Sequence, residues 1–118
     1  MNKNKMNIWS PSEEKYFLEQ ATEQQTLDYL KKHVVYTGSE KWLIQNSSKE
    51  VLEELFRQQP LVPKNEELLI TQRSERLVQS YIMRYPLGPE AEKLLKELHK
   101  EEALQLYEKM YGKLKEGA

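Results

Sequence analysis

The sequence predicts an all-α fold, a stack of about four short helical hairpins, and three observations lead to this prediction. First, residues 39–64 and 65–89 match in character at nearly every apolar position, and Pro60 falls on Pro86, which gives a period of 26 residues. A fixed period in this range is typical of stacked repeats. Second, the apolar residues of each copy recur at helical spacing. Third, the two end copies become polar at positions that are apolar inside the array.

The composition favours a folded domain with a heavily solvated exterior. Of the 118 residues, 38% are hydrophobic and 31% charged, a balance that alone leans towards disorder, but the apolar residues are strongly periodic. A formal net charge of −1 gives no global attraction to nucleic acid or to an anionic membrane. The absence of cysteine excludes disulfides and thiolate-based metal or redox chemistry.

No membrane-spanning or secretory segment is expected. The longest apolar runs are only a few residues long, and the basic N-terminus lacks the apolar core and cleavage site of a secretory signal. We therefore expect a cytoplasmic protein. Residues 1–9 are expected to form a flexible N-terminal tail, and residues 10–116 the helical repeat domain. Trp9 is expected to pack on the first helical pair, and the alternative is that it docks a partner.

The first helix has several agreeing start signals. Ser10 can act as the N-cap, Pro11 suits the first helical position, and Glu13 completes a capping box. The repeat extends back to this helix, because residues 16–18 lie one period before residues 42–44. It also extends forward to Tyr107. Four copies therefore cover almost everything after the tail.

Each copy is predicted to contain two short helices separated by a polar break. The first helices are expected to end near Ala21, Ser47, Arg73 and His99. Thr22, Ser48 and Ser74 then supply N-cap hydroxyls for the second helices. Lys100 offers no such cap, so we expect the two helices of the fourth copy to run together.

The loops between copies combine a helix stop with a buried apolar residue. Pro60 and Pro86 end the second helices because proline lacks the amide donor and restricts the residue before it. Leu61 and Leu87 are then expected to plug into the core. After the first copy, residues 37–40 (TGSE) are expected to form a turn and the next capping box.

The ends of the array supply the best test of the alignment. Positions that face the following copy are apolar in the first three copies and polar in the last: Leu18, Ile44 and Ile70 precede Lys96, and Leu30, Phe56 and Ile82 precede Glu108. Positions that face the preceding copy begin polar: Gln25 comes before Val51, Leu77 and Ala103, and Thr26 before Leu52, Val78 and Leu104. Leu98 and Leu106 depart from this pattern. They either pack the C-terminal helix or mark a self-association face.

The pattern resembles the short α–α hairpin repeats of α-solenoid proteins, the group that contains HEAT and tetratricopeptide arrays. It is most similar to uncharacterised bacterial helical-repeat proteins, and residues 68–70, 77–78, 81–82 and 85–87 carry the likeness. The copies are shorter than tetratricopeptide units and lack their tryptophan and alanine motif. The resemblance covers residues 12–112 and implies a fold and a scaffold role, but it transfers no functional residue.

Nothing in the sequence predicts catalysis, a cofactor or a metal site. His99 and Glu102 have a spacing that suits two metal ligands, but no third ligand is indicated. His33 is expected to be a helix-end histidine. No glycine-rich phosphate loop or nucleophile motif is present. Adjacent glutamates are interpreted as solvated helix faces: Glu53-Glu54, Glu66-Glu67 and Glu101-Glu102. We therefore expect a protein that is not an enzyme.

The functional prediction is a protein-protein interaction module that binds a protein or peptide. All four arginines lie between Arg57 and Arg84, and part of this group falls on the solvent face of the third copy's second helix. Arginine and aromatic side chains are favoured anchors in interfaces. The candidate partner-binding residues are Arg73, Arg76, Gln79, Met83, Arg84 and Tyr85.

The alternative function is a small helix-turn-helix-like regulator that binds nucleic acid. Residues 74–85 would then be the recognition helix, with the arginines near phosphates. The overall charge balance and Glu75 at the start of that helix disfavour this alternative.

Overall fold

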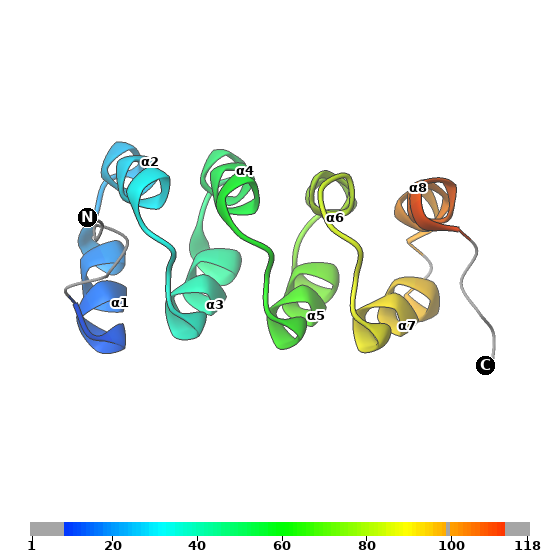
Figure 1. Ribbon diagram of the computed structural model, residues 1–118, viewed down its shortest axis with the longest axis horizontal. Coiled ribbons are helices and arrows are strands. Elements are labelled where there is room, and N and C mark those ends of the chain that lie inside the picture. The colour runs from blue at the N-terminus through cyan, green and yellow to red at the C-terminus, as the bar shows by residue number, and fades with distance from the viewer. Residues whose placement is uncertain (1–8, 99, 113–118) are drawn as a thin grey trace. The chain divides into compact units, whose positions relative to one another are not determined.

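The computed structural model describes residues 9–98 and 100–112, and all regular structure in them is α-helical (Figure 1). The chain divides into two compact units, Met1–Pro60 and Leu61–Ala118, each with two helical hairpins. The predicted all-α fold of short hairpins is therefore confirmed. The tail predicted over residues 1–9 lies outside the described residues except for Trp9. The described helices are α1 (Pro11–Gln20), α2 (Glu23–Lys32), α3 (Thr37–Asn46), α4 (Lys49–Gln58), α5 (Pro63–Gln72), α6 (Glu75–Ile82), α7 (Pro89–Glu97) and α8 (Glu101–Tyr111).

In unit 1, the first helices of the two hairpins pack side by side, and so do the second helices. α1 contacts α3 and α2 contacts α4, which gives two layers (Figure 1). The caps follow the prediction. Ser10 and Glu13 form the capping box of α1, and the side chains of Thr22 and Ser48 accept backbone N–H groups of α2 and α4. These bonds pair amide donors that would otherwise lack an intrahelical partner.

Unit 2 repeats this plan. α5 packs beside α7, α6 packs beside α8, and each helix also contacts the partner of its own hairpin. Ser74 caps α6 by accepting from the backbone N–H of Leu77, as predicted. Pro63 and Pro89 stand at the start of α5 and α7, where the missing amide proton is harmless.

The prediction that the last two helices run together is wrong. α7 ends at Glu97 and α8 begins at Glu101, and the Lys100 side chain makes no capping bond. The cap comes from another helix: the Ala103 N–H in the first turn of α8 donates to Oε2 of Glu75, at 2.8 Å. A carboxylate at this place pairs a free amide and also favours the positive end of the helix. The residues near Lys100 do not predict this acceptor, because Glu75 lies 28 positions before Ala103 in the chain.

The predicted capping box at residues 37–40 is also wrong. α3 already begins at Thr37, with Tyr36 as an N-cap whose side chain makes no capping bond. Ser39 and Glu40 therefore lie inside the first turn, and both are buried. At the start of this helix, the backbone N–H of Tyr36 donates to Oε1 of Glu14 on α1, at 2.9 Å.

The buried positions agree with the predicted columns. Ile44, Phe56, Ile70 and Ile82 are each 0% exposed, and Lys96 and Gln25 lie at the surface. The loop residues Leu61 and Leu87 are buried as expected. One end position differs: Thr26 is buried, because it shares a helix face with the buried Leu30 one turn later.

Trp9 packs on the first hairpin, as predicted. Its ring centroid lies 4.8 Å from that of Phe17 and 5.7 Å from that of Tyr29, with the Tyr29 ring almost parallel to it. The carbonyl oxygen of Trp9 also accepts the Tyr36 hydroxyl, at 2.8 Å. Aromatic contacts of this kind stabilise by about 0.5–1.5 kcal/mol beyond simple burial. At the other end, Leu98 is exposed and Leu106 is half-buried.

Candidate functional site

The predicted partner-binding face is presented by α6. This helix buries Leu77, Val78, Tyr81 and Ile82 on one side, which leaves its opposite side to solvent. Arg76 is exposed, Gln79 is half-buried, and Met83, directly after the helix, is 62% exposed. Their spacing of three and four residues places them along one helix face.

Arg84 is exposed and anchored at the end of the same helix. Its Nη1 donates to the carbonyl oxygen of Ser80 at 3.0 Å and to the Ser80 hydroxyl at 3.2 Å. A cation is favourable there because the last carbonyl groups of a helix carry partial negative charge. These bonds hold the guanidinium near Met83 and leave its remaining donors available to a ligand.

The structure does not place all six predicted residues on this face. Arg73 belongs to the break between α5 and α6, and it is half-buried. Tyr85 is half-buried, and its ring packs against that of Tyr81 at 5.1 Å. The surface that the structure brings together consists of Arg76, Gln79, Met83 and Arg84, which we call the α6 face. Tyr85 lies at its edge.

The sequence analysis missed a set of buried carboxylates. Each first helix carries a glutamate in its first turn, one period apart along the chain: Glu14, Glu40, Glu66 and Glu92. Glu14, Glu40 and Glu66 are at most 5% exposed, and Glu92 is half-buried. In three hairpins the carboxylate accepts the hydroxyl of a tyrosine that lies 15 residues later. The pairs are Tyr29 with Glu14, Tyr81 with Glu66, and Tyr107 with Glu92.

These pairs extend to the backbone of the loops. The Tyr81 hydroxyl accepts the N–H of Leu61 at 3.0 Å, and the Tyr107 hydroxyl accepts the N–H of Leu87 at 3.1 Å. The second oxygen of Glu66 accepts the N–H of Gly88, at 2.9 Å, just where α7 begins. Buried backbone donors in loops need such acceptors, and the glutamate–tyrosine pairs supply them.

The protonation of the tyrosines suits this structural role. Burial raises the pKa of Tyr29 well above its ordinary value, and the hydrogen bond to Glu14 raises it further. Burial likewise raises the pKa of Tyr107, with the bond to Glu92 as the second cause. Both phenols therefore remain donors at neutral pH. Because the Tyr81 and Tyr107 hydroxyls each bond a carboxylate and a loop amide, we interpret these pairs as structural links between the helices and the loops.

The interpretation of adjacent glutamates as solvated faces needs correction for two of them. Glu66 is buried because it pairs with Tyr81. Glu54 is buried as well, and its Oε1 accepts Nη1 of Arg57 at 2.6 Å. Glu101 and Glu102 are exposed, as expected. The burial of Glu66 could have been inferred from the alignment of the copies. A glutamate stands at its position in every copy, which is unusual for an exposed position.

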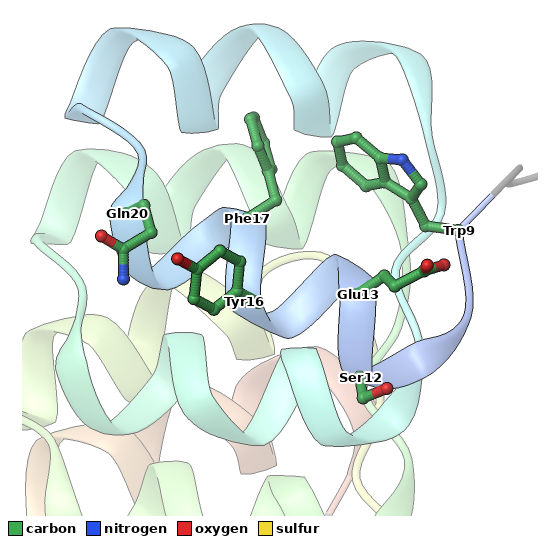
Figure 2. A pocket seen from close by; sticks show the side chains of 6 residues that line it. All are labelled: Trp9, Ser12, Glu13, Tyr16, Phe17 and Gln20. Carbon is green, nitrogen blue, oxygen red and sulfur yellow. The ribbon is translucent and has the colours of Figure 1, made fainter.

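A hollow lies on the outer side of α1 (Figure 2). Its volume is about 490 Å³, and it is lined by Trp9, Ser12, Glu13, Tyr16, Phe17 and Gln20. Tyr16 is 65% exposed, the most of the large hydrophobic side chains in the described part of the chain. The sequence analysis aligned residues 16–18 with residues 42–44 of the next copy and did not anticipate an open aromatic surface here.

The described residues hold no cluster of histidine, cysteine, aspartate or glutamate that suits a metal ion. The predicted pairing of His99 with Glu102 lies outside them. His33 ends α2, as expected, with its ring 4.4 Å from that of Tyr29. In the same part of the chain, no helix combines the length and the apolar character needed to cross a bilayer.

Comparisons with family models, with curated proteins and with solved structures gave no match to this chain. The proposals below therefore rest on its own residues and geometry.

Proposed function

We propose that the protein is a non-catalytic protein-interaction module, built from repeats of the α-solenoid kind, whose α6 face binds a peptide or protein segment. One observation carries this proposal: Met83, 62% exposed, follows α6 on the same face as the exposed Arg76, and the exposed Arg84 comes directly after it. Methionine and arginine are enriched in protein interfaces, and an exposed methionine adapts its shape to different partners.

The chemistry of the α6 face indicates an acidic partner. Arg76 and Arg84 each present a planar guanidinium that binds carboxylates in a bidentate manner. Met83, next to Arg84, supplies the apolar contact. A segment with an apolar anchor flanked by aspartate or glutamate fits this arrangement. The cysteine-free composition is compatible with the reducing cytoplasm that we propose as its location.

Affinity capture from cells with matched baits tests this proposal. We expect the wild-type chain to recover partners that the double variant Arg76→Glu/Arg84→Glu loses, about tenfold or more by quantitative mass spectrometry. The control is Lys31→Glu/Lys32→Glu, which makes the same charge change at two exposed residues of unit 1. This control should keep the partners.

Two outcomes would contradict the proposal. Equal recovery by the wild type and the double variant would remove the α6 face as the binding site. Retention of the wild type on DNA, with a steep loss as salt increases, would favour the nucleic-acid alternative, because phosphate contacts release counterions.

A further inference from the structure

Part of the hollow on α1, at Glu13 and Phe17, occupies the place that a neighbouring helix covers in other hairpins. In unit 1, Ser39 and Leu43 of α3 lie one period after Glu13 and Phe17 of α1, and they are 1% and 0% exposed beside α1. On α1, Glu13 is exposed and Phe17 is half-buried. The same side of a first helix is thus covered on α3 and open on α1.

Unit 2 gives an independent case of the same covering. Ala91 and Leu95 of α7 hold the equivalent positions and are 1% and 0% exposed, and α5 packs against α7. In both units, therefore, a neighbouring first helix covers these positions: α1 covers them on α3, and α5 covers them on α7. Among the described residues no helix precedes α1, so its outer side keeps the open hollow.

We propose that this hollow is a docking site for an amphipathic α-helix of a partner protein, which packs on α1 as α1 packs on α3. Tyr16, Phe17 and Trp9 form its aromatic wall (Figure 2). Ser12 and Gln20 add hydrogen-bonding groups at the rim. On the partner helix, an aliphatic residue faces α1. It takes the position that Leu18 holds on α1, which packs on α3, and that Ile70 holds on α5, which packs on α7.

Charge at the rim specifies the flanks of the partner helix. Glu13 is exposed, and its Oε1 accepts the Ser10 N–H, which leaves further acceptor sites on the carboxylate. Lys15, the one basic residue of α1, forms an ion pair with Glu19, with Nζ 3.4 Å from Oε2. A lysine or arginine beside the aliphatic anchor therefore complements this surface.

A second copy of this chain is a poor occupant. The side of its last hairpin that would cover α1 carries the exposed Lys96 where the internal copies carry Ile44 and Ile70. Burying this charged side chain in place of an isoleucine would oppose the association. The occupant is therefore a different helix, with an aliphatic residue at that position.

Titration with a helical probe tests the proposal. The probe is a labelled peptide that copies α5, Pro63–Gln72, with Glu67→Lys to place a positive charge beside Ile70. A side-chain staple holds it helical, because so short a peptide is not helical alone in water. We expect saturable binding to the full chain by fluorescence anisotropy, with a dissociation constant below about 1 mM.

Three variants locate the binding. Tyr16→Lys should weaken it by about fivefold or more, because it removes an exposed aromatic wall. Val34→Lys, the matched change at an exposed residue of unit 1 that does not line the hollow, should leave it unchanged. Glu13→Gln keeps the capping box but removes the charge, so it should abolish the preference for this probe over the unsubstituted α5 peptide.

Clear outcomes would overturn this inference. The proposal fails if the wild type does not bind the probe, or if Tyr16→Lys binds it as well as the wild type does. It also fails if sedimentation shows a dimer of the chain that Tyr16→Lys abolishes, since the occupant would then be a second copy. None of these results bears on the α6 face, which belongs to unit 2.

Discussion

The second hairpin solves the same structural problem as the two hairpins of unit 2 with a different residue. Where α2, α6 and α8 carry a tyrosine, α4 carries Leu55, and Gln59 at the end of that helix takes over. Its amide oxygen accepts the N–H of Val35 at 3.0 Å, and its amide nitrogen donates to Oε2 of Glu40 at 2.7 Å. A phenol that both accepts and donates is thus replaced by an amide that does both. The requirement is a buried group with both functions, and the residue type can vary.

The free energy of unfolding should decrease most when the hydrogen bonds of a buried tyrosine are removed. We expect Tyr81→Phe to lower the free energy of unfolding by roughly 3 kcal/mol, because it leaves the Leu61 N–H and the buried Glu66 carboxylate without this partner. Denaturant unfolding followed by circular dichroism measures the change. Tyr16→Phe, which removes an exposed hydroxyl, is the control and should stay within about 0.5 kcal/mol of the wild type. A loss of similar size in both variants would contradict the role of the buried pair.

Removing the hydrogen bonds of Gln59 should decrease the free energy of unfolding somewhat less. We expect Gln59→Ala to cost roughly 2 kcal/mol, since it removes one partner each from the Val35 N–H and Glu40. Gln45→Ala, at an exposed position of α3, is the matched control and should be nearly neutral. The same unfolding measurement applies. If Gln59→Ala were neutral, the loop N–H would not depend on this amide, and the equivalence of the two solutions would fail.

The stability of the tyrosine hairpins should also depend on pH in the alkaline range, whereas that of the glutamine hairpin should not. Folding raises the pKa of Tyr29 and Tyr107, so the folded state favours the protonated phenol. This contribution is fully present below the ordinary value of 10.0 and is lost as the pH rises above it. We expect the wild type to lose stability more steeply than Tyr107→Phe above that pH. Parallel pH profiles for the two proteins would contradict the prediction, and the second hairpin contributes no such loss because Leu55 does not titrate.

Periodicity made most of the fold predictable. The columns of Ile44 and Phe56, the N-caps at Thr22, Ser48 and Ser74, and the exposed Lys96 follow from local spacing and from the alignment of copies. Several of the missed features depend on partners far away in the chain. The cap that Glu75 provides for α8 joins residues 28 positions apart, and the Glu66–Tyr81 pair joins residues 15 apart. Sequence patterns do not reveal where two side chains meet.

Of the two candidate surfaces, one could be predicted from the sequence and the other could not. The α6 face was predictable, because the residues opposite an apolar stripe on a helix face solvent. The separation of Arg73 from it was not, since that depends on where α5 ends. The hollow on α1 was hidden because Tyr16 and Phe17 occupy columns that are buried or half-buried in other copies. They are more exposed because no helix in the described part of the chain covers this side of α1, which is a property of the assembled structure.

The bond from Glu66 to the amide of Gly88 has a consequence for how such a chain can change over time. It connects one hairpin to the main chain that opens the next, so the spacing between hairpins depends on an interior carboxylate and on backbone atoms. The outward side chains take no part in this connection. Random substitution can therefore rewrite the outer surface, and with it the choice of ligand, while the pitch of the repeat stays the same.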